Sequence, residues 1–197
     1  MNTDLVLKAE KYCKKLLKNG RCNLLQFHNY EHTSEVAHNA KFLANRLNLS
    51  STEKEMVVIA AYFHDVGNIE TTQGHEKLSC AYAREFLQKE SYPENQIQIV
   101  ENIIQATEMS VMPTTVLEEI MCDADLSHLG MTTFFERNRL LRKEWETFLD
   151  MKFTDDEWVK LNVKFLNEHR FYTKAAIAAF ENQKKHNPSL FQDNFHS

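Results

Sequence analysis

Residues 56–68 of this 197-residue chain read MVVIAAYFHDVGN, the most informative segment for its architecture. Its first eight residues are apolar on nearly every side, a pattern typical of a helix at the centre of a core. The ionisable pair His64-Asp65 follows directly, at the C-terminal end of the predicted helix. Such a pair is costly to bury unless something compensates for it, and a divalent cation is the simplest compensation. The stretch therefore predicts a central helix that ends at a metal site.

Apolar residues at helical spacing continue outward from this central helix in both directions. The chain contains only four glycines and three prolines, and architectures of strands and tight turns need many more. We therefore expect an all-α fold, a compact single-domain helical bundle, in which Ser51 caps the central helix. The expected helices cover residues 5–19, 30–47, 52–66, 75–87, 93–108, 113–122, 132–149, a segment that starts at 154, and 173–185.

No linker, repeat or low-complexity segment divides the chain, so we expect one domain over residues 1–197. The polar end of the chain, residues 187–197, is expected to fray. Three phenylalanines, Phe134, Phe135 and Phe148, are compatible both with core packing and with a homodimer interface.

Composition excludes several functional classes. A formal charge of −5 argues against binding of a nucleic-acid polymer, which usually requires an excess of basic residues. The four cysteines are scattered without a CxxC pair, so neither a disulfide framework nor a thiolate zinc site is expected. The N-terminus lacks the apolar core of a signal peptide, and no apolar run is long enough to cross a bilayer. These features predict a cytoplasmic protein without membrane contact.

Four segments carry histidines or acids: FHNYEHT (27–33), YFHDVGN (62–68), GHEKLS (74–79) and CDADLSHLG (122–130). His28 and His32 are four residues apart, so on a helical turn they would share a face. Imidazole and carboxylate ligands together suit a divalent transition metal, namely iron, manganese, zinc, nickel or cobalt, better than calcium, and magnesium is also compatible.

These segments closely resemble the HD-domain superfamily of metal-dependent phosphohydrolases, over a metal-site core of about residues 24–130, with C-terminal helices at about 131–186. The resemblance implies an HD-type helical bundle. By position it assigns four metal ligands, which are His32, His64, Asp65 and Asp125. It also implies that Asp123 orients a ligand or a bound water.

The segment 27–33 also resembles the HNxxH signature of cyclic-nucleotide phosphodiesterases, in which the first histidine protonates the leaving oxygen. That position is His28 here. Many HD enzymes have Lys or Glu three residues after the HD aspartate, where this chain has Asn68, which can contact substrate but cannot transfer a proton. Proton transfer is therefore assigned to His28 rather than to Glu70, and Asp65 is expected to orient or deprotonate the attacking water.

Dinuclear members of the superfamily usually add two histidines between the HD pair and the last aspartate. His75 matches the first, but the segment IIQATEMS (103–110) contains no histidine for the second. We therefore expect one tightly bound ion. For His75 three roles stay open: contact with the substrate phosphate, support of a weaker second ion, or an ordinary surface position.

The remaining basic residues and histidines are assigned no chemistry. His38 and His128 are expected to be structural. The cluster of Arg137, Arg139 and Arg142 is a candidate phosphate clamp, but its interleaved glutamates favour a solvated helix face.

The predicted reaction is attack of a metal-activated water on the phosphorus of a nucleotide or another small phosphate mono- or diester. Two alternatives stay open. One is a non-catalytic metal-containing nucleotide sensor, which Asn68 favours. The other is a di-iron HD oxygenase, which the missing second histidine disfavours.

Overall fold

The computed structural model describes residues 2–19 and 21–195, with side chains to residue 191. Within these residues every regular element is a helix, which confirms the all-α fold class. The chain divides into two compact units, residues 1–125 and 126–197, which are described separately. The single domain expected from the sequence stays a prediction. No helix in the described ranges is long and apolar enough to cross a membrane.

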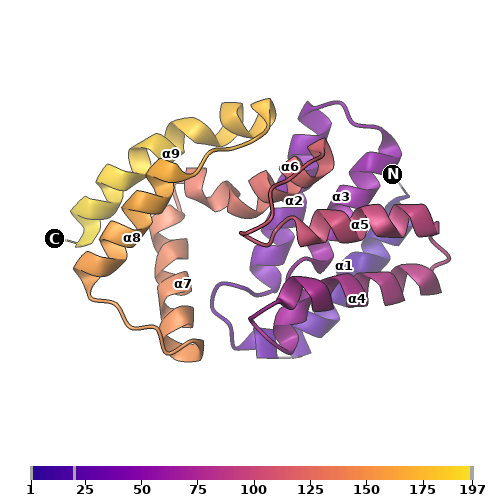
Figure 1. The fold of residues 1–197 in the computed structure, drawn as a ribbon, viewed down its shortest axis with the longest axis horizontal. Helices are drawn as coiled ribbons and strands as arrows, with labels where there is room; N and C mark the ends of the chain where they lie inside the picture. Colours follow the sequence, from indigo (N-terminus) through magenta and orange to yellow (C-terminus); the bar gives the residue numbers. More distant parts are fainter. Residues whose placement is uncertain (1, 20, 196–197) are drawn as a thin grey trace. The chain divides into compact units, whose positions relative to one another are not determined.

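The first unit is built around the central helix α3, which contacts α1, α2, α5 and α6 (Figure 1). Val57, Ile59 and Phe63 of α3 have no exposed surface, so the predicted core position of this helix is confirmed. The elements of this unit are α1 (Thr3–Asn19), η1 (Arg21–Asn23), α2 (Tyr30–Arg46), α3 (Ser51–Phe63), η2 (Val66–Ile69), α4 (His75–Lys89), α5 (Glu94–Gln105) and α6 (Val116–Asp125). The first helix ends at Asn19 as expected, and Gly20 lies outside the described residues.

Both ends of α3 differ from the prediction. Ser50, not Ser51, is the N-cap, because its hydroxyl accepts from the Glu53 N–H while the Glu53 carboxylate accepts from the Ser50 N–H. The helix ends at Phe63 rather than Val66, and a 3-10 turn follows. The reason is tertiary: Gly67 packs so closely against α4 that a Cβ atom there would lie 2.0 Å from the His75 carbonyl oxygen.

The helices that flank the segment 106–115 are also displaced from their predicted bounds. α5 ends at Gln105 rather than 108, where the Thr107 hydroxyl turns back and donates to the Ile104 carbonyl at 2.8 Å. α6 starts at Val116, because the Thr115 hydroxyl caps it by accepting from the Glu118 N–H at 3.3 Å. The helix continues to Asp125. The predicted start at Pro113 and end at Cys122 were therefore three residues early at each end.

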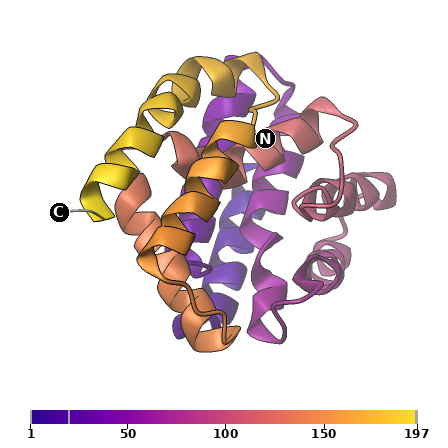
Figure 2. The same ribbon diagram turned by 60° about the vertical axis from the view of Figure 1, so that its left-hand side comes forward.

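The second unit has its own apolar core, which contains Trp158, Phe134 and Phe191. Helices α8 and α9 lie side by side in both views (Figure 1, Figure 2). Phe134 and Phe135 stack against Phe191 with ring centroids 5.3 and 5.8 Å apart, so both pack inside this unit, and a homodimer stays a prediction. The elements are η3 (Leu126–Gly130), α7 (Phe134–Phe148), α8 (Asp155–Glu168) and α9 (Lys174–Phe195).

The last helix is longer than predicted. It continues through Pro188 to Phe195, although the sequence placed its end at Lys185 and a frayed tail from residue 187. Two observations explain the extension. Phe191 is buried, with only 1% of its surface exposed, and the Asn187 side chain donates to the Leu129 carbonyl at 2.7 Å. Residues 196–197 of the predicted tail lie outside the described residues.

Candidate metal centre

His32 is placed by the start of α2. Asn29 is the N-cap of this helix, and its side-chain oxygen accepts from the His32 N–H at 3.2 Å. The Asn29 amide also donates to the carbonyls of Leu25 and Gln26, which fixes the preceding loop. The asparagine of the HNxxH segment therefore orients the histidine that follows it. This role was not predicted from the sequence, although Asn is a favoured N-cap residue.

His64 and Asp65 lie in the turn between α3 and η2. The His64 Nδ1–H group donates to the Ala61 carbonyl at 2.8 Å, which directs Nε2 into the centre. Ser79 of α4 stabilises the backbone of this turn. Its hydroxyl donates to the His64 carbonyl at 2.6 Å and accepts from the Gly67 N–H at 2.9 Å. Ser79 is fully buried, and no sequence pattern pointed to it.

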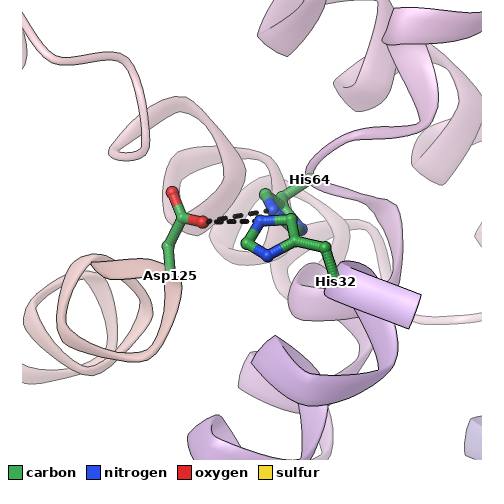
Figure 3. A group of neighbouring side chains, drawn as sticks. All are labelled: His32, His64 and Asp125. Atoms are coloured by element: carbon green, nitrogen blue, oxygen red, sulfur yellow. Dashed lines mark hydrogen bonds and ion pairs between the residues drawn. The ribbon is translucent and has the colours of Figure 1, made fainter. Parts of the chain in front are cut away.

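Asp125 completes the group from the last residue of α6. Figure 3 shows its carboxylate facing the imidazoles of His32 and His64. Asp125 Oδ1 lies 3.1 Å from His32 Nε2 and 3.5 Å from His64 Nε2. Asp65 Oδ2 lies 3.6 and 3.2 Å from the same two nitrogen atoms. The four residues that the resemblance assigned as ligands thus come together from the first turn of α2, the turn after α3 and the end of α6.

The donor atoms are spaced as the ligands of one transition-metal ion would be. Bonds of about 2.1 Å place neighbouring ligand atoms roughly 3.0–3.5 Å apart in octahedral or tetrahedral geometry. The donor atoms of His32, His64 and Asp125 all lie within 4.8 Å of one another. In addition, His64 Nε2 and Asp65 Oδ2 are buried without a hydrogen-bond partner. Buried polar atoms without partners are rare, and a shared cation would satisfy these two.

The charges of the group compensate one another. Burial lowers the pKa of His64, but the carboxylates of Asp65 and Asp125 outweigh it and hold this pKa well above the usual range. Burial raises the pKa of Asp65 and of Asp125, but the neighbouring histidines hold both pKa values well below the usual range. Without a cation the site therefore keeps an imidazolium between carboxylates, and a cation would displace the imidazolium proton.

His28 and His75 lie next to the four predicted ligands. His28 precedes the N-cap of α2 rather than lying on the helix, but its ring still meets the His32 ring edge-on with centroids 5.8 Å apart. His75, at the start of α4, places Nε2 3.2 Å from Asp65 Oδ1. Burial lowers the pKa of His75, yet Asp65 and the Thr72 carbonyl raise it above the usual value. Both histidines can therefore act on a molecule bound at the centre.

Asn68 lies behind Asp65. Asn68 is buried, with 1% of its surface exposed, and its side-chain amide donates to Asp65 Oδ1 at 3.1 Å. The contact that the structure shows is with the carboxylate, and contact with substrate stays a prediction. Glu70 is exposed and accepts from the Tyr82 hydroxyl, whereas Asp123 is fully buried. His38 lies on the surface of α2.

The predicted solvated face of α7 contains an ordered arginine. Arg142 donates to the carboxylates of Glu146 and Asp155 at 2.9 and 2.6 Å, and also to the Phe153 carbonyl. These contacts join α7 to the start of α8 within the second unit. Arg142 is thus engaged in structural ion pairs and only 17% exposed, and Glu144 is buried, so this part of the helix is not the solvated face that the sequence predicted.

The residues of the group differ in their exposure to solvent. The side chains of His32, His64 and Asp65 are at most 3% exposed, whereas those of Asp125 and His75 are 23% and 18% exposed. His28 is also partly exposed. An incoming molecule would therefore meet Asp125, His75 and His28 before the deeper donors.

Comparison with known proteins agrees with this geometry. A family model for the HD domain matches residues 29–129, which include all four predicted ligands as well as His75. No curated protein and no solved structure matches the chain. The family match spans the segment from the cap of α2 to η3 and covers just over half of the 197 residues.

Proposed function

Because this chain belongs to the HD-domain family, we propose that it is a phosphohydrolase that uses a divalent transition metal to cleave a small phosphate ester, with a nucleotide as the expected substrate class. The observation that carries the proposal is the buried pair His64 Nε2 and Asp65 Oδ2, which lie 3.2 Å apart beside the imidazole of His32 and form no hydrogen bond. A site with these donors would hold one cation through His32, His64, Asp65 and Asp125.

A bound divalent cation would supply a Lewis acid that polarises a phosphoryl oxygen and makes a nearby water more acidic. Asp65 would orient the attacking water through its carboxylate, which Asn68 and His75 hold in place at 3.1 and 3.2 Å. His28, in its protonated form, would donate a proton to the leaving oxygen from the open side of the centre. The product is inorganic phosphate from a monoester or a monoester from a cyclic diester.

The non-catalytic sensor stays an alternative, because Asn68 cannot transfer a proton. Its buried amide instead holds Asp65, which is compatible with the proposed chemistry, with His28 as the proton donor. The di-iron oxygenase alternative would need further histidine ligands. The segment 103–110, where the sequence pattern would put one, ends α5 without a histidine.

Metal analysis and turnover on the same sample test the proposal. The protein would be purified without added metal, its metals measured by mass spectrometry, and activity assayed with p-nitrophenyl phosphate, bis-(p-nitrophenyl) phosphate and nucleotides. Mn, Fe, Co, Ni, Zn and Mg would each be added separately. We expect metal-dependent turnover of at least one ester. Bound metal without turnover of any ester would contradict the phosphohydrolase and favour the sensor.

Two matched variants locate the activity. Asp65→Asn should abolish metal binding and turnover, whereas Asp150→Asn should change neither, because the Asp150 side chain is 89% exposed and lies in the second unit. His28→Gln should keep the metal but lower kcat by about 10²–10⁴-fold, the usual contribution of a general acid. Full activity of His28→Gln would remove His28 from the mechanism without affecting the metal assignment.

A further inference from the structure

Arg21 is linked to the metal centre through a chain of contacts, although it belongs to none of the sequence motifs described above. Its Nη2 atom donates to the Thr72 hydroxyl at 3.1 Å. The Thr72 carbonyl accepts from His75 Nδ1–H at 3.0 Å, and His75 Nε2 lies 3.2 Å from Asp65 Oδ1. Three successive contacts therefore connect the guanidinium to a carboxylate of the metal centre.

The same residues are accessible to solvent. The short helix η1, which carries Arg21, contacts η2, which directly follows the HD turn. Arg21, Thr72 and His75 are all partly exposed, whereas His32, His64 and Asp65 are buried. A molecule from solvent can therefore contact these three exposed residues.

The chemistry of arginine defines what it would recognise there. A guanidinium stays charged at every working pH, and its planar fork matches the oxygens of a phosphate. The attraction between a fixed positive charge and an anion scales with the charge of the anion. A fully ionised phosphomonoester is a dianion, whereas a phosphodiester is a monoanion, so a neighbouring arginine favours the monoester.

We propose that Arg21 binds the substrate phosphate and that Thr72 positions it, which makes a phosphomonoester the preferred substrate class. The inference rests on the proposed phosphohydrolase function and deepens it. It supplies a permanent cation at the site.

Binding of inorganic phosphate to the metal-loaded protein tests the role of Arg21 without turnover. Isothermal titration should show at least tenfold weaker phosphate binding for Arg21→Gln than for the wild type, with equal metal content. Arg46→Gln is the matched control, because Arg46 is exposed at the far end of α2 and packs over the Phe42 ring. Unchanged phosphate affinity in Arg21→Gln would overturn the proposal.

Turnover then tests the substrate preference. Arg21→Gln should raise KM for p-nitrophenyl phosphate at least tenfold and change the KM for bis-(p-nitrophenyl) phosphate less, and Arg21→Lys should restore part of the loss. Thr72→Val should give an intermediate KM. Equal effects on both esters would overturn the monoester preference. If the wild type hydrolyses neither ester, the proposed function fails, and the phosphate titration still decides whether Arg21 binds an anion.

Discussion

The Nδ1–H group of His64 donates to the carbonyl oxygen of Ala61, one turn earlier in the central helix, over 2.8 Å. Because a carbonyl only accepts, the hydrogen must be on Nδ1. This contact fixes the ring so that Nε2 faces Asp65 Oδ2 at 3.2 Å in a pocket without a hydrogen-bond partner for either atom. The backbone of α3 thereby orients a predicted ligand, and a bound cation would satisfy both polar atoms.

Metal binding should therefore stabilise the fold. A ligand at a concentration 100 times its Kd adds about 2.7 kcal/mol to the free energy of unfolding. For a chain of this size that corresponds to a rise in Tm of roughly 5–10 °C, measurable by scanning calorimetry with and without EDTA. His64→Gln should lose this increment, whereas His38→Gln, at an exposed position, should keep it. An equal metal-dependent shift in His64→Gln would place the ion elsewhere.

The turn after the HD pair should not tolerate a side chain at Gly67. A Cβ atom at this position would lie 2.0 Å from the His75 carbonyl oxygen, which belongs to the backbone and cannot move aside cheaply. Overpacking usually costs about 1–3 kcal/mol, and a backbone clash should reach at least the upper end of that range. We expect Gly67→Ala to lower both the Tm and the bound metal, measured by calorimetry and mass spectrometry.

Gly130→Ala is the matched comparison for Gly67→Ala. Its Cβ would lie 2.4 Å from the Phe180 carbonyl oxygen, an equally close backbone contact within the second unit. It should lower the Tm but leave the metal content of the folded protein unchanged. If both variants lose metal equally, the loss reflects general unfolding and not displacement of His75.

The sequence predicted the parts of the site that local patterns encode. The apolar run before His64 identified the central helix, and the histidine and acid segments identified the residues that meet at the centre. The end of α3 was wrong because it depends on Gly67 packing against a helix that starts eight residues later. Helical periodicity contains no information about such a tertiary contact.

The supporting polar contacts were not predictable for the same reason. Ser79 bonds to residues 12 and 15 positions earlier, and Arg21 to a threonine 51 positions later. Single serines, threonines and arginines occur throughout the chain, so their residue types alone did not distinguish these positions. The extension of α9 was missed because Pro188 indicates a helix end, whereas burial of Phe191 determines the observed structure.

The second unit should depend on a buried polar network. Trp158 Nε1 donates to Asn138 Oδ1 at 2.6 Å, and the Asn138 amide donates to Asn162 Oδ1 at 2.5 Å. Asn138→Ala leaves both partners unsatisfied, which should cost about 2–4 kcal/mol. Urea denaturation followed by tryptophan fluorescence measures this loss, because both tryptophans of the chain, Trp145 and Trp158, lie in this unit.

A surface asparagine on the same unit gives the control for that measurement. Asn182 is exposed on α9, so Asn182→Ala should stay within about 0.5 kcal/mol of the wild type. A loss below 1 kcal/mol in Asn138→Ala would show that water replaces the missing partners and that the network contributes little.

The stability of the protein should fall as the pH drops below about 6.5, in part because of His169. Burial, and then the charge of Lys184, lower the pKa of His169 to about 4, and its Nδ1 atom is buried without a hydrogen-bond partner. Above pH 6.5 the imidazole is neutral in both folded and unfolded protein, so the full stability is present. Between pH 6.5 and 4 only the unfolded chain takes up the proton, and stability is lost.

Replacing His169 should therefore flatten this pH dependence. We expect the free energy of unfolding of the metal-free wild type to lose about 1–2 kcal/mol more than that of His169→Gln between pH 7.5 and 5, a figure discounted for partial exposure of the ring. Urea denaturation in EDTA at the two pH values measures the difference. His186→Gln, at an exposed position of α9, should follow the wild type, because the effect requires burial beside Lys184 and not merely a histidine. Identical pH dependence in wild type and His169→Gln would mean that the folded protein accommodates the protonated ring, for example by turning it to solvent.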